Sequence, residues 1–440
     1  MSWNLWFTSS SRRHVRWGLT ALLAVTLAGA PGGVLAETVS DWSEPETIAA
    51  FPPQPDEEYP DARVVVGPGD DAAASWLVER AAGGYRVHVS VRGEDGTWAP
   101  TGPLSKRVRE NVTVDLAVDG DGDTSVVWER WGVDGPQVEY VRCDLSGSCT
   151  EPEIVGPGRM ADVEVDRAGA ATVAFKQGDV LRVRRRTDAG WGKTRAYRAP
   201  AVWKHSLDVN PDGDAMLSWF EWRTERTRAV VHRAGEGWPR PQTVMRDRRA
   251  FRVNSLMDRR GRAMFVGQTF EEFDEVARRY LNGIVWTKLR ADGTWAPMRN
   301  YNDDLGEDGT LWDVAMNPRG QGLAVWFAHR GDDLRTEVAR FDITGTWGGG
   351  HELSQTWSHS QPWVGIDGVA RVVFEKLTRS TFINYVEHNP GEGWSDPVWL
   401  DTAGLTEADG GRTRMVYGAI EGMKLEGYEL WARVLDVTAD

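Results

Sequence analysis

A short pattern of apolar and polar positions recurs eight times along the chain. A strand of alternating or apolar residues leads into a tight Gly turn. A more apolar strand follows, and in most copies it carries a large side chain six residues after the Gly. Clear copies are VDGDGDTSVVW, VNPDGDAMLSW and MNPRGQGLAVW, which end at Trp128, Trp219 and Trp326. The copies are spaced about 43 to 59 residues apart. Repeats of this length made of strands and turns predict an all-β fold, the β-propeller of four-stranded antiparallel blades.

The rest of each repeat supplies a third and a fourth strand. The third strand alternates apolar and charged residues, as in YRVHVSVR at 85–92, which is typical of a half-buried strand. A second Gly turn then ends in Trp, which we expect to cover the turn and pack on the next blade. The outer strand contains Pro in several copies, and Pro is tolerated where one side of a strand faces solvent. The six turn tryptophans are Trp98, Trp191, Trp238, Trp295, Trp347 and Trp394.

The number of repeats predicts eight blades. Seven is the alternative if one irregular unit, 161–200 or 252–300, fails to form a full blade. The last repeat lacks an outer strand before Asp440, whereas the segment 41–49 reads as an outer strand with no repeat before it. We therefore expect the N-terminal strand at 41–49 to complete the last blade, so that the N- and C-terminal strands pair and close the propeller.

The first 36 residues have a different character. Arg12, Arg13 and Arg16 precede an apolar run from Trp17 to Ala30, and Val34-Leu35-Ala36 forms a small-residue cleavage site. This order is typical of a signal peptide, and its apolar core is too short for a permanent membrane span. We predict a signal peptide at 1–36, a single propeller domain at 37–440, and a secreted, extracellular protein with no membrane span.

Charge and cysteine content narrow the expected partners. The 440-residue chain has a net charge of −14, and nucleic-acid binding depends on a basic surface, so we expect no nucleic-acid partner. The only two cysteines, Cys143 and Cys149, flank five turn-forming residues between two strands. In an oxidising compartment this spacing favours a disulfide across a hairpin. We expect a monomer whose partner is a glycan or an extracellular protein.

The second Gly turn resembles the Asp-box of sialidase-like propellers, also called the bacterial neuraminidase repeat. Asp95-Gly96-Thr97-Trp98 and Asp292-Gly293-Thr294-Trp295 stand between the third and fourth strands, where that box lies. The leading Ser and the Asp-to-Trp spacing of the box differ. The resemblance covers about 42–440 and implies an exo-sialidase-like glycoside hydrolase with an arginine triad, a Tyr/Glu nucleophile pair and an Asp acid. No segment of the chain maps onto those residues, so the catalytic residues stay unknown.

Binding groups are expected on the loops of variable length, which in a propeller share one face around the central channel. These loops combine aromatic rings, which stack on sugars, with groups that bind hydroxyls. Channel plugs are the alternative role for the loop aromatics. The predicted ligand-binding residues are Trp203, His205, Arg249, Tyr301, Trp357 and His359. We therefore expect a non-enzymatic protein that binds carbohydrate or a protein partner. A sialidase-like hydrolase is the alternative, and a structural role without a small ligand is a third reading.

Two further segments carry weaker signals. Asp119, Asp121 and Asp123 alternate as Ca²⁺ ligands do, but Thr124 and Arg130 stand where a calcium loop needs Gly and Glu. We therefore expect an ordinary turn there, and no metal or other cofactor. The insertion 268–283 spaces Phe270, Phe273, Val276 and Tyr280 as in a helix, which favours a short helix over the loop-bearing face.

Overall fold

The computed structural model describes residues 46–436, except 52–61, 68–70, 80–83, 94–95, 107, 109–111, 247–248, 275–278, 302–307, 331–332, 356–359, 366, 378–380, 400–413 and 425–426. Every regular element in these ranges is a strand, and none is a helix. Residues 41–440 form one compact unit. No helix of membrane-crossing length and hydropathy occurs in the part of the chain that is described.

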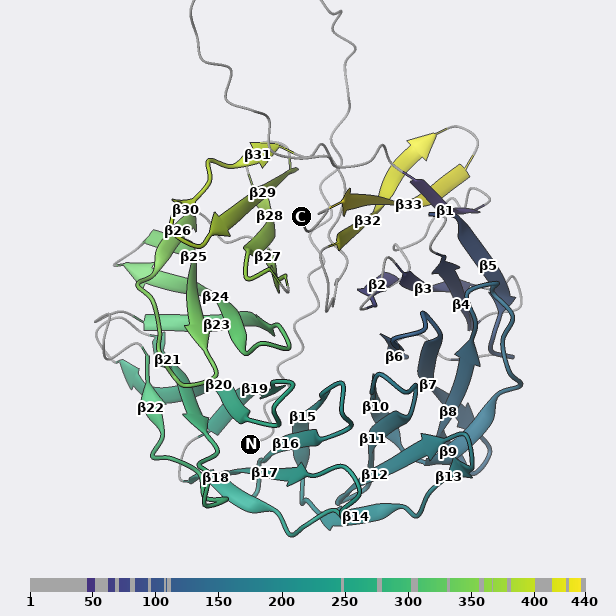
Figure 1. Ribbon diagram of the computed structural model, residues 1–440, viewed down its shortest axis with the longest axis horizontal. Coiled ribbons are helices and arrows are strands. Elements are labelled where there is room, and N and C mark those ends of the chain that lie inside the picture. Colours follow the sequence, from purple (N-terminus) through teal and green to yellow (C-terminus); the bar gives the residue numbers. More distant parts are fainter. Residues whose placement is uncertain are drawn as a thin grey trace, which may run out of the picture. The chain divides into compact units, whose positions relative to one another are not determined.

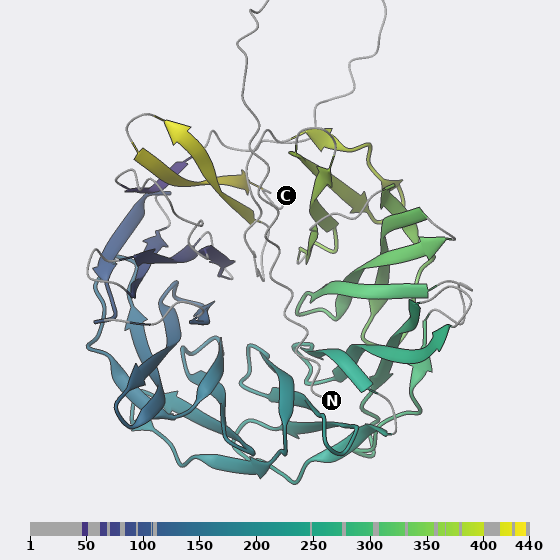
Figure 2. The ribbon, with the colours of Figure 1, turned by 180° about the vertical axis from the view of Figure 1, so that it is seen from behind.

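Seven antiparallel sheets of four or five strands follow one another in chain order (Figure 1; Figure 2 shows them from the opposite side). The first contains β2 (Ala62–Val66), β3 (Ala72–Glu79), β4 (Tyr85–Arg92) and β5 (Trp98–Pro103). The second contains β6 (Val114–Val118), β7 (Thr124–Gly132), β8 (Gly135–Cys143) and β9 (Glu153–Pro157). The third contains β10 (Arg159–Val165), β11 (Ala171–Gln177), β12 (Val180–Thr187), β13 (Gly190–Trp191) and β14 (Arg195–Arg198). The fourth contains β15 (Val202–Val209), β16 (Ala215–Glu221), β17 (Arg226–His232) and β18 (Gln242–Arg246).

The remaining sheets repeat this order. The fifth contains β19 (Arg249–Met257), β20 (Ala263–Asp274), β21 (Arg279–Lys288) and β22 (Arg299–Asn300). The sixth contains β23 (Asp308–Met316), β24 (Gln321–Arg330), β25 (Asp333–Asp342) and β26 (His351–Ser354). The seventh contains β27 (Ser360–Val364), β28 (Ala370–Leu377), β29 (Thr381–Asn389), β30 (Gly393–Trp394) and β31 (Val398–Trp399). Both units that sequence reasoning left in doubt, 161–200 and 252–300, thus form complete sheets.

An eighth, three-stranded sheet joins the two ends of the compact unit. It has the order β1 (Glu46–Phe51), β33 (Gly427–Asp436) and β32 (Arg414–Lys424). β1 pairs antiparallel with β33, and Thr47 lies opposite Trp431. This sheet has one strand fewer than a full blade, so the count of seven or eight blades stays a prediction.

In the second to sixth sheets, the Asp or Asn that opens the first turn holds that turn with its own side chain. Asp258 Oδ1 accepts hydrogen bonds from the backbone N–H groups of Arg260 and Arg262, at 3.0 and 2.8 Å. Asn210 and Asn317 make the same two bonds in their own turns. The Asp or Asn that opens the turn therefore satisfies backbone donors that the reversal of the chain leaves free.

The second strands form the cores between neighbouring sheets. Trp128, Trp219 and Trp326, on β7, β16 and β24, are completely buried. The cluster around Trp219 includes Leu181 of the third sheet and Val230 of the fourth, so one apolar layer joins the two. Burial of such large rings makes each interface a major source of stability.

The tryptophans of the second turn pack backwards rather than forwards. Trp191 of the third sheet lies edge-on to Tyr140 of the second, with ring centroids 5.2 Å apart, and its Nε1 donates to Glu153 at 2.6 Å. Trp394 of the seventh sheet stacks on His351 of the sixth. The prediction that these rings pack on the next blade is therefore wrong, because the turn brings them onto the outer half of the preceding sheet.

Arginines at the ends of third strands bind each sheet to the next. Arg185 Nη1 donates to the carbonyl of Gly213 at 2.9 Å, and Arg233 Nη1 donates to that of Gly261 at 2.6 Å. Arg340 repeats the contact with Gly368. Each acceptor is the Gly of the following sheet's first turn, so one hydrogen bond fixes both elements.

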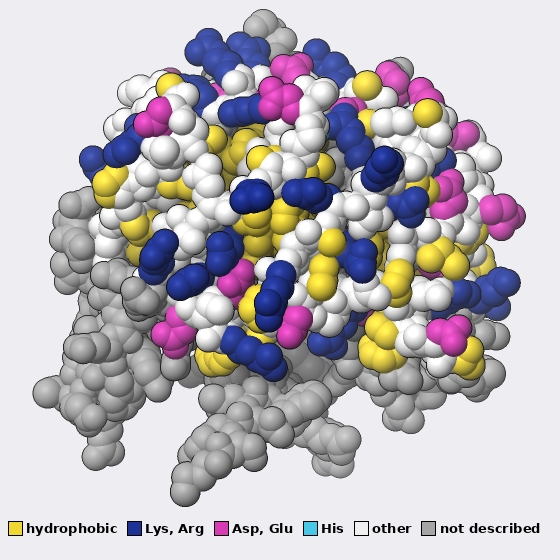
Figure 3. All heavy atoms as spheres, turned by 90° about the horizontal axis from the view of Figure 1, so that it is seen from below, with side chains coloured by type: hydrophobic (Ala, Val, Ile, Leu, Met, Phe, Trp, Pro, Cys, Tyr) yellow, Lys and Arg dark blue, Asp and Glu magenta, His cyan; other side chains and the backbone are white. Residues whose placement is uncertain are grey.

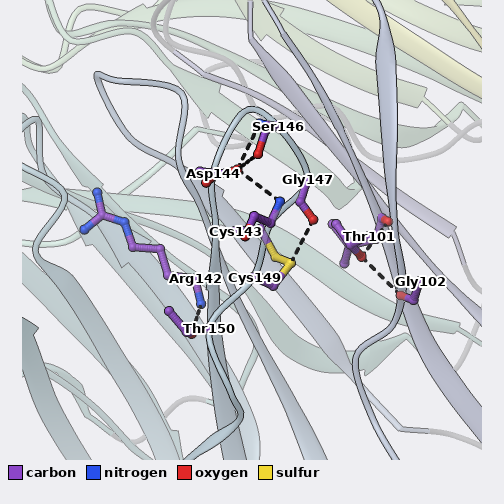
Figure 4. The surroundings of a disulfide bond; sticks show 11 residues. Thr101, Gly102, Arg142, Cys143, Asp144, Ser146, Gly147, Cys149 and Thr150 are labelled. Atoms are coloured by element: carbon purple, nitrogen blue, oxygen red, sulfur yellow. Dashed lines mark hydrogen bonds between the residues drawn. A yellow bond between two sulfur atoms is a disulfide. The ribbon is translucent and has the colours of Figure 1, made fainter.

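Two local predictions have opposite outcomes. The disulfide between Cys143 and Cys149 is present, and it closes the β8–β9 hairpin beside Asp144, whose Oδ1 accepts from Ser146 and Ser148 (Figure 4). The helix predicted over 268–283 is wrong. That segment extends β20 and β21 into a longer hairpin, in which Phe270 pairs with Asn282. Ladder hydrogen bonds continued from the sheet override its helical spacing of apolar residues.

Candidate functional site

The first strands of all seven sheets line one cavity of about 290 Å³. It is a central channel whose walls are the exposed edges of β2, β6, β10, β15, β19, β23 and β27. The residue four positions before each first turn is polar in every sheet and lines this channel. These residues are Arg63, Asp115, Asp162, Ser206, Asn254, Asp313 and Gln361.

Several channel side chains accept hydrogen bonds from backbone N–H groups on the inner edge of the following sheet. Asp115 Oδ2 accepts from the backbone N–H of Val163 at 2.7 Å. Ser206 Oγ accepts from the N–H of Ser255 at 3.0 Å, and Asp208 Oδ2 accepts from the N–H of Met257 at 2.5 Å. Because unpaired buried donors are costly, these contacts give the channel polar groups a structural role.

His205 lies at the wall of this channel but is buried. Its side chain is 1% exposed, and Nε2 lies 3.3 Å from Oδ2 of Asp162. Desolvation lowers the pKa of His205 to about 4, so the ring is neutral at pH 7 and the contact is not an ion pair. Within the described ranges, neither ring nitrogen makes a hydrogen bond of good geometry, although the backbone of Ala174 lies close enough to interact with the ring. The predicted role of His205 in ligand binding stays a prediction.

At the opposite end of the sheets from the Gly turns, two tryptophans are exposed side by side. Trp203 is the second residue of β15 and is 58% exposed, and Trp222 follows β16 and is 43% exposed. Their ring centroids lie 6.2 Å apart, at an interplanar angle of 37°. We call Trp203 and Trp222 the tryptophan pair. A single exposed ring is ordinary, but two adjacent exposed rings form a contiguous apolar patch of the kind that marks a binding surface.

Asp179, in the β11–β12 turn, fixes the backbone that carries the tryptophan pair. Its carbonyl oxygen accepts from the N–H of Ala199 at 2.8 Å, and its Oδ1 accepts from the N–H of Ala201 at 3.2 Å. Oδ2 lies 3.6 Å from Arg223 Nη1, in the β16–β17 turn. One aspartate of the third sheet therefore ties together the two loops that present the tryptophans.

Ala201 completes this arrangement in a strained conformation. Its φ of +54° lies in the left-handed region, which residues other than Gly rarely adopt. Its carbonyl accepts from the N–H of Trp222 at 3.2 Å, and Lys176 Nζ donates to the carbonyl of the adjacent Val202 at 2.6 Å. Non-Gly residues held in this region cluster at functional sites, where surrounding contacts impose the geometry.

The other predicted ligand residues do not join this surface in the part of the chain described. Tyr301 is buried, and its hydroxyl donates to the carbonyl of Gly348 at 2.8 Å. Arg249 belongs to β19, but its side chain lies outside the described part, as do Trp357 and His359 entirely. Sequence reasoning selected Trp203 but missed the second tryptophan, Trp222. The available signal was the run SWFEW, in which aromatic residues continue past the repeat position.

The weak calcium candidate has other partners. Asp119 Oδ1 accepts from the N–H groups of Asp121 and Asp123, and Oδ2 lies 2.7 Å from Arg142 Nη2. Arg142 also pairs with Asp123 at 3.0 Å. No cluster of His, Cys, Asp or Glu suited to a metal ion occurs among the residues described.

A tyrosine, a glutamate and an arginine do meet in the seventh sheet. Tyr385 donates to Glu387 Oε2 at 2.7 Å, and Arg371 Nε donates to the tyrosine hydroxyl at 3.2 Å. All three side chains are buried, and desolvation raises the pKa of Tyr385 far above its usual value. A nucleophilic phenolate needs the opposite shift and access to substrate. This cluster therefore does not supply the pair that the sialidase resemblance implies.

Comparisons with known proteins support the fold. No family model and no curated protein matches the chain. Among solved structures, the polysaccharide lyase PL25-ulvanlyase is similar with 11% identity and a TM-score of 0.51, over 88% of this chain and 95% of that one. The BP39L lectin from Burkholderia pseudomallei has 13% identity and a TM-score of 0.51, over 78% of this chain and all of that one. The β-propeller domain of the Trilobed protease from Pyrococcus furiosus has 10% identity and a TM-score of 0.44, over 78% and 99%. The first two likenesses show a shared fold and nothing finer, and the propeller-like architecture itself rests on the seven antiparallel sheets that follow one another in chain order. No comparison supports the sialidase resemblance more specifically.

Proposed function

We propose that this protein is a secreted, non-enzymatic β-propeller that binds carbohydrate through the tryptophan pair. The observation that carries the proposal is the pair itself, Trp203 and Trp222, exposed side by side on loops that Asp179 holds in place. A sugar presents C–H groups to an aromatic face and hydroxyls to nearby polar groups. Here the tryptophan pair supplies the aromatic faces, and Asp179 and Arg223 supply polar groups. A lectin and a polysaccharide lyase are among the proteins of similar fold, which is in keeping with a carbohydrate ligand.

The proposal includes eight blades, with the three-stranded sheet as the eighth. Its support is the pairing of β1 with β33, which brings the N-terminal strand to the last repeat. Deleting residues 37–51 of the mature protein removes β1 and leaves the edge of β33 without its partner. We expect the melting temperature to fall. An unchanged melting temperature would contradict closure through β1.

The binding function is tested with the purified mature protein, residues 37–440, on a glycan array and by titration of the best glycan found. We expect Trp203→Ala and Trp222→Ala each to weaken binding by about tenfold, because an aromatic stacking contact is lost. Trp131→Ala is the matched control. Trp131 is 38% exposed at the end of β7 in another sheet, so its loss should leave affinity unchanged.

The same protein is assayed with fluorogenic glycosides to separate the alternatives. Binding without release of the fluorophore supports the proposed function. Release that survives in every tryptophan variant would favour a hydrolase whose site lies elsewhere. An array without any bound glycan would contradict carbohydrate binding and favour a structural role.

A further inference from the structure

We infer that the glycan bound at the tryptophan pair is anionic, a polysaccharide that carries carboxylate or sulfate groups. This inference rests on the proposed function. Its basis is a reversal of charge. The whole chain has a net charge of −14, yet residues 159–246, which form the third and fourth sheets, contain 17 Lys and Arg against 11 Asp and Glu. A local excess of +6 on an acidic protein creates a field that attracts anions to one region.

The outer strands of these two sheets carry much of the excess. Figure 3 views the molecule from below Figure 1, on the side where β14, β17 and β18 lie, and Lys and Arg side chains spread across that face. Arg195 and Arg198 are exposed on β14, and Arg246 is exposed on β18. The region is therefore basic at the surface as well as in composition.

Strand register places Arg226 and Arg246 at the end of the fourth sheet that carries Trp222. Arg226 lies opposite both Glu221 and Arg246 in the fourth sheet, and the turn between Glu221 and Arg226 contains Trp222. Cross-strand partners project from the same face of a sheet. Arg226 and Arg246 therefore share a face at the end of the sheet where Trp222 is exposed.

Arg198 reaches the same region from the third sheet. It ends β14 opposite Val180, next to the turn that contains Asp179. The chain then runs through Ala199 and Ala201, both held by Asp179, into Trp203. Arg198 is thus fixed at the start of the loop that presents Trp203.

The nearby carboxylates already have partners. Glu221 is buried and pairs with Arg228 Nε at 3.1 Å, and Asp179 lies beside Arg223. Arg198, Arg226 and Arg246 form no ion pair with any carboxylate in the described ranges. Planar guanidinium groups bind carboxylate and sulfate oxygens in a bidentate manner. Three arginines at the same end of these sheets as two exposed rings therefore suit an acidic sugar chain.

The experiment compares charged and neutral polymers on the mature protein. The probes are polygalacturonate, dextran sulfate and uncharged dextran, titrated at two salt concentrations. We expect tighter binding of the anionic polymers and a loss of that binding at high salt, because screening weakens exposed charge contacts. The double variant Arg226→Gln/Arg246→Gln should weaken anionic binding by roughly tenfold, since two charge-assisted contacts are removed.

The matched control is Arg260→Gln/Arg319→Gln. It makes the same change in net charge at two exposed arginines of the Gly turns, and anionic binding should be unchanged. An equal loss in both variants would overturn the site and leave only a net-charge effect. Salt-independent binding of dextran as tight as that of the anionic polymers would overturn the inference and leave the proposed function intact. Failure of all three polymers, together with a blank glycan array, would instead contradict the proposed function.

Two further probes test whether the surface binds any polyanion rather than acidic sugar chains. Duplex DNA and phosphatidylserine vesicles are titrated under the same conditions. Weak binding of both, with the anionic polysaccharides preferred, supports the inference. If either binds as tightly and loses affinity equally in Arg226→Gln/Arg246→Gln, the surface recognises charge without the sugar, and the inference is wrong.

Discussion

The two ends of the third and fourth sheets differ in how their polar groups are used. At the Gly-turn end, Arg185 pairs with Asp166 of its own sheet and donates to the carbonyl of Gly213 in the next. At the loop end, Arg226 and Arg246 stand at the same end of the fourth sheet as the exposed Trp222, and neither has a described acidic partner. The first end directs its charges inward and stabilises the fold. The second leaves them available at the surface.

Backbone geometry differs in the same direction. The Gly turns place glycine at the positions of positive φ, as at Gly213 and Gly261, so the reversal costs little. At the loop end alanine occupies that region, at Ala201. Backbone strain and exposed apolar rings both lower stability, and natural proteins accept such local losses at functional sites.

The largest expected effect is the difference in stability loss between replacing a buried and replacing an exposed tryptophan. Trp219→Ala should lower the free energy of unfolding by about 3–5 kcal/mol, because it empties a fully buried position between the two sheets. Trp203→Ala should change it by less than about 0.5 kcal/mol, as most exposed substitutions do. Chemical denaturation of both variants measures the difference. Equal losses would show that the loop end is part of the core.

Acid should destabilise the protein through His205, which lies between these same two sheets. The folded-state pKa of about 4 is below the unfolded value of 6.5, so the unfolded chain binds the proton more tightly. Stability is full above pH 6.5 and declines as pH falls towards 4, by on the order of 3 kcal/mol. His205→Gln should flatten the profile of unfolding free energy between pH 7 and pH 4.5. A wild-type profile that stays flat over that interval would contradict a buried neutral imidazole.

At the Gly-turn end, Asp258 offers a graded test. Asp258→Ala removes the acceptor for two backbone N–H groups and the partner of Arg262, and should lower the free energy of unfolding by about 2 kcal/mol. Asp258→Asn should cost clearly less, because Asn210 and Asn317 hold the equivalent turns. Thermal melts of the two variants side by side decide this. Identical losses would mean that the Arg262 pair, rather than the turn, carries the effect.

The repeat was readable from sequence because each blade must satisfy the same local physics. Gly at positive φ, Asp or Asn at the turn and a mostly apolar second strand are requirements of one chain segment, and they recur in most copies. The direction in which Trp191 packs was not readable, because it depends on how neighbouring sheets are placed. The hairpin at Phe270 was missed for a related reason, since its strand ladder overrides the local spacing.

The candidate site was only half readable. Trp203 stood out in a variable loop, but Trp222 lies just past the end of β16, three residues after the repeat position Trp219. Their contact depends on Asp179, some 24 residues before the first of them. Burial of His205 and Tyr301 likewise follows from packing between sheets, which residue type alone does not reveal.

The smallest expected effect tests the strain at Ala201 itself. Ala201→Gly relieves a left-handed alanine but enlarges the conformational freedom of the unfolded chain, so we expect a net gain in unfolding free energy of about 0.5 kcal/mol. The loop should also become less rigid, since glycine restricts the backbone between Asp179 and Trp203 less than alanine does. Glycan affinity should therefore fall by roughly threefold while stability rises, because the loop then loses conformational entropy when it becomes ordered on binding. Gly213→Ala is the converse control at the Gly-turn end. There the added Cβ meets Arg185 Nη2 at 2.6 Å, so stability should fall without any change in affinity. A gain in both stability and affinity for Ala201→Gly would show that the strain has no part in presenting the tryptophan pair.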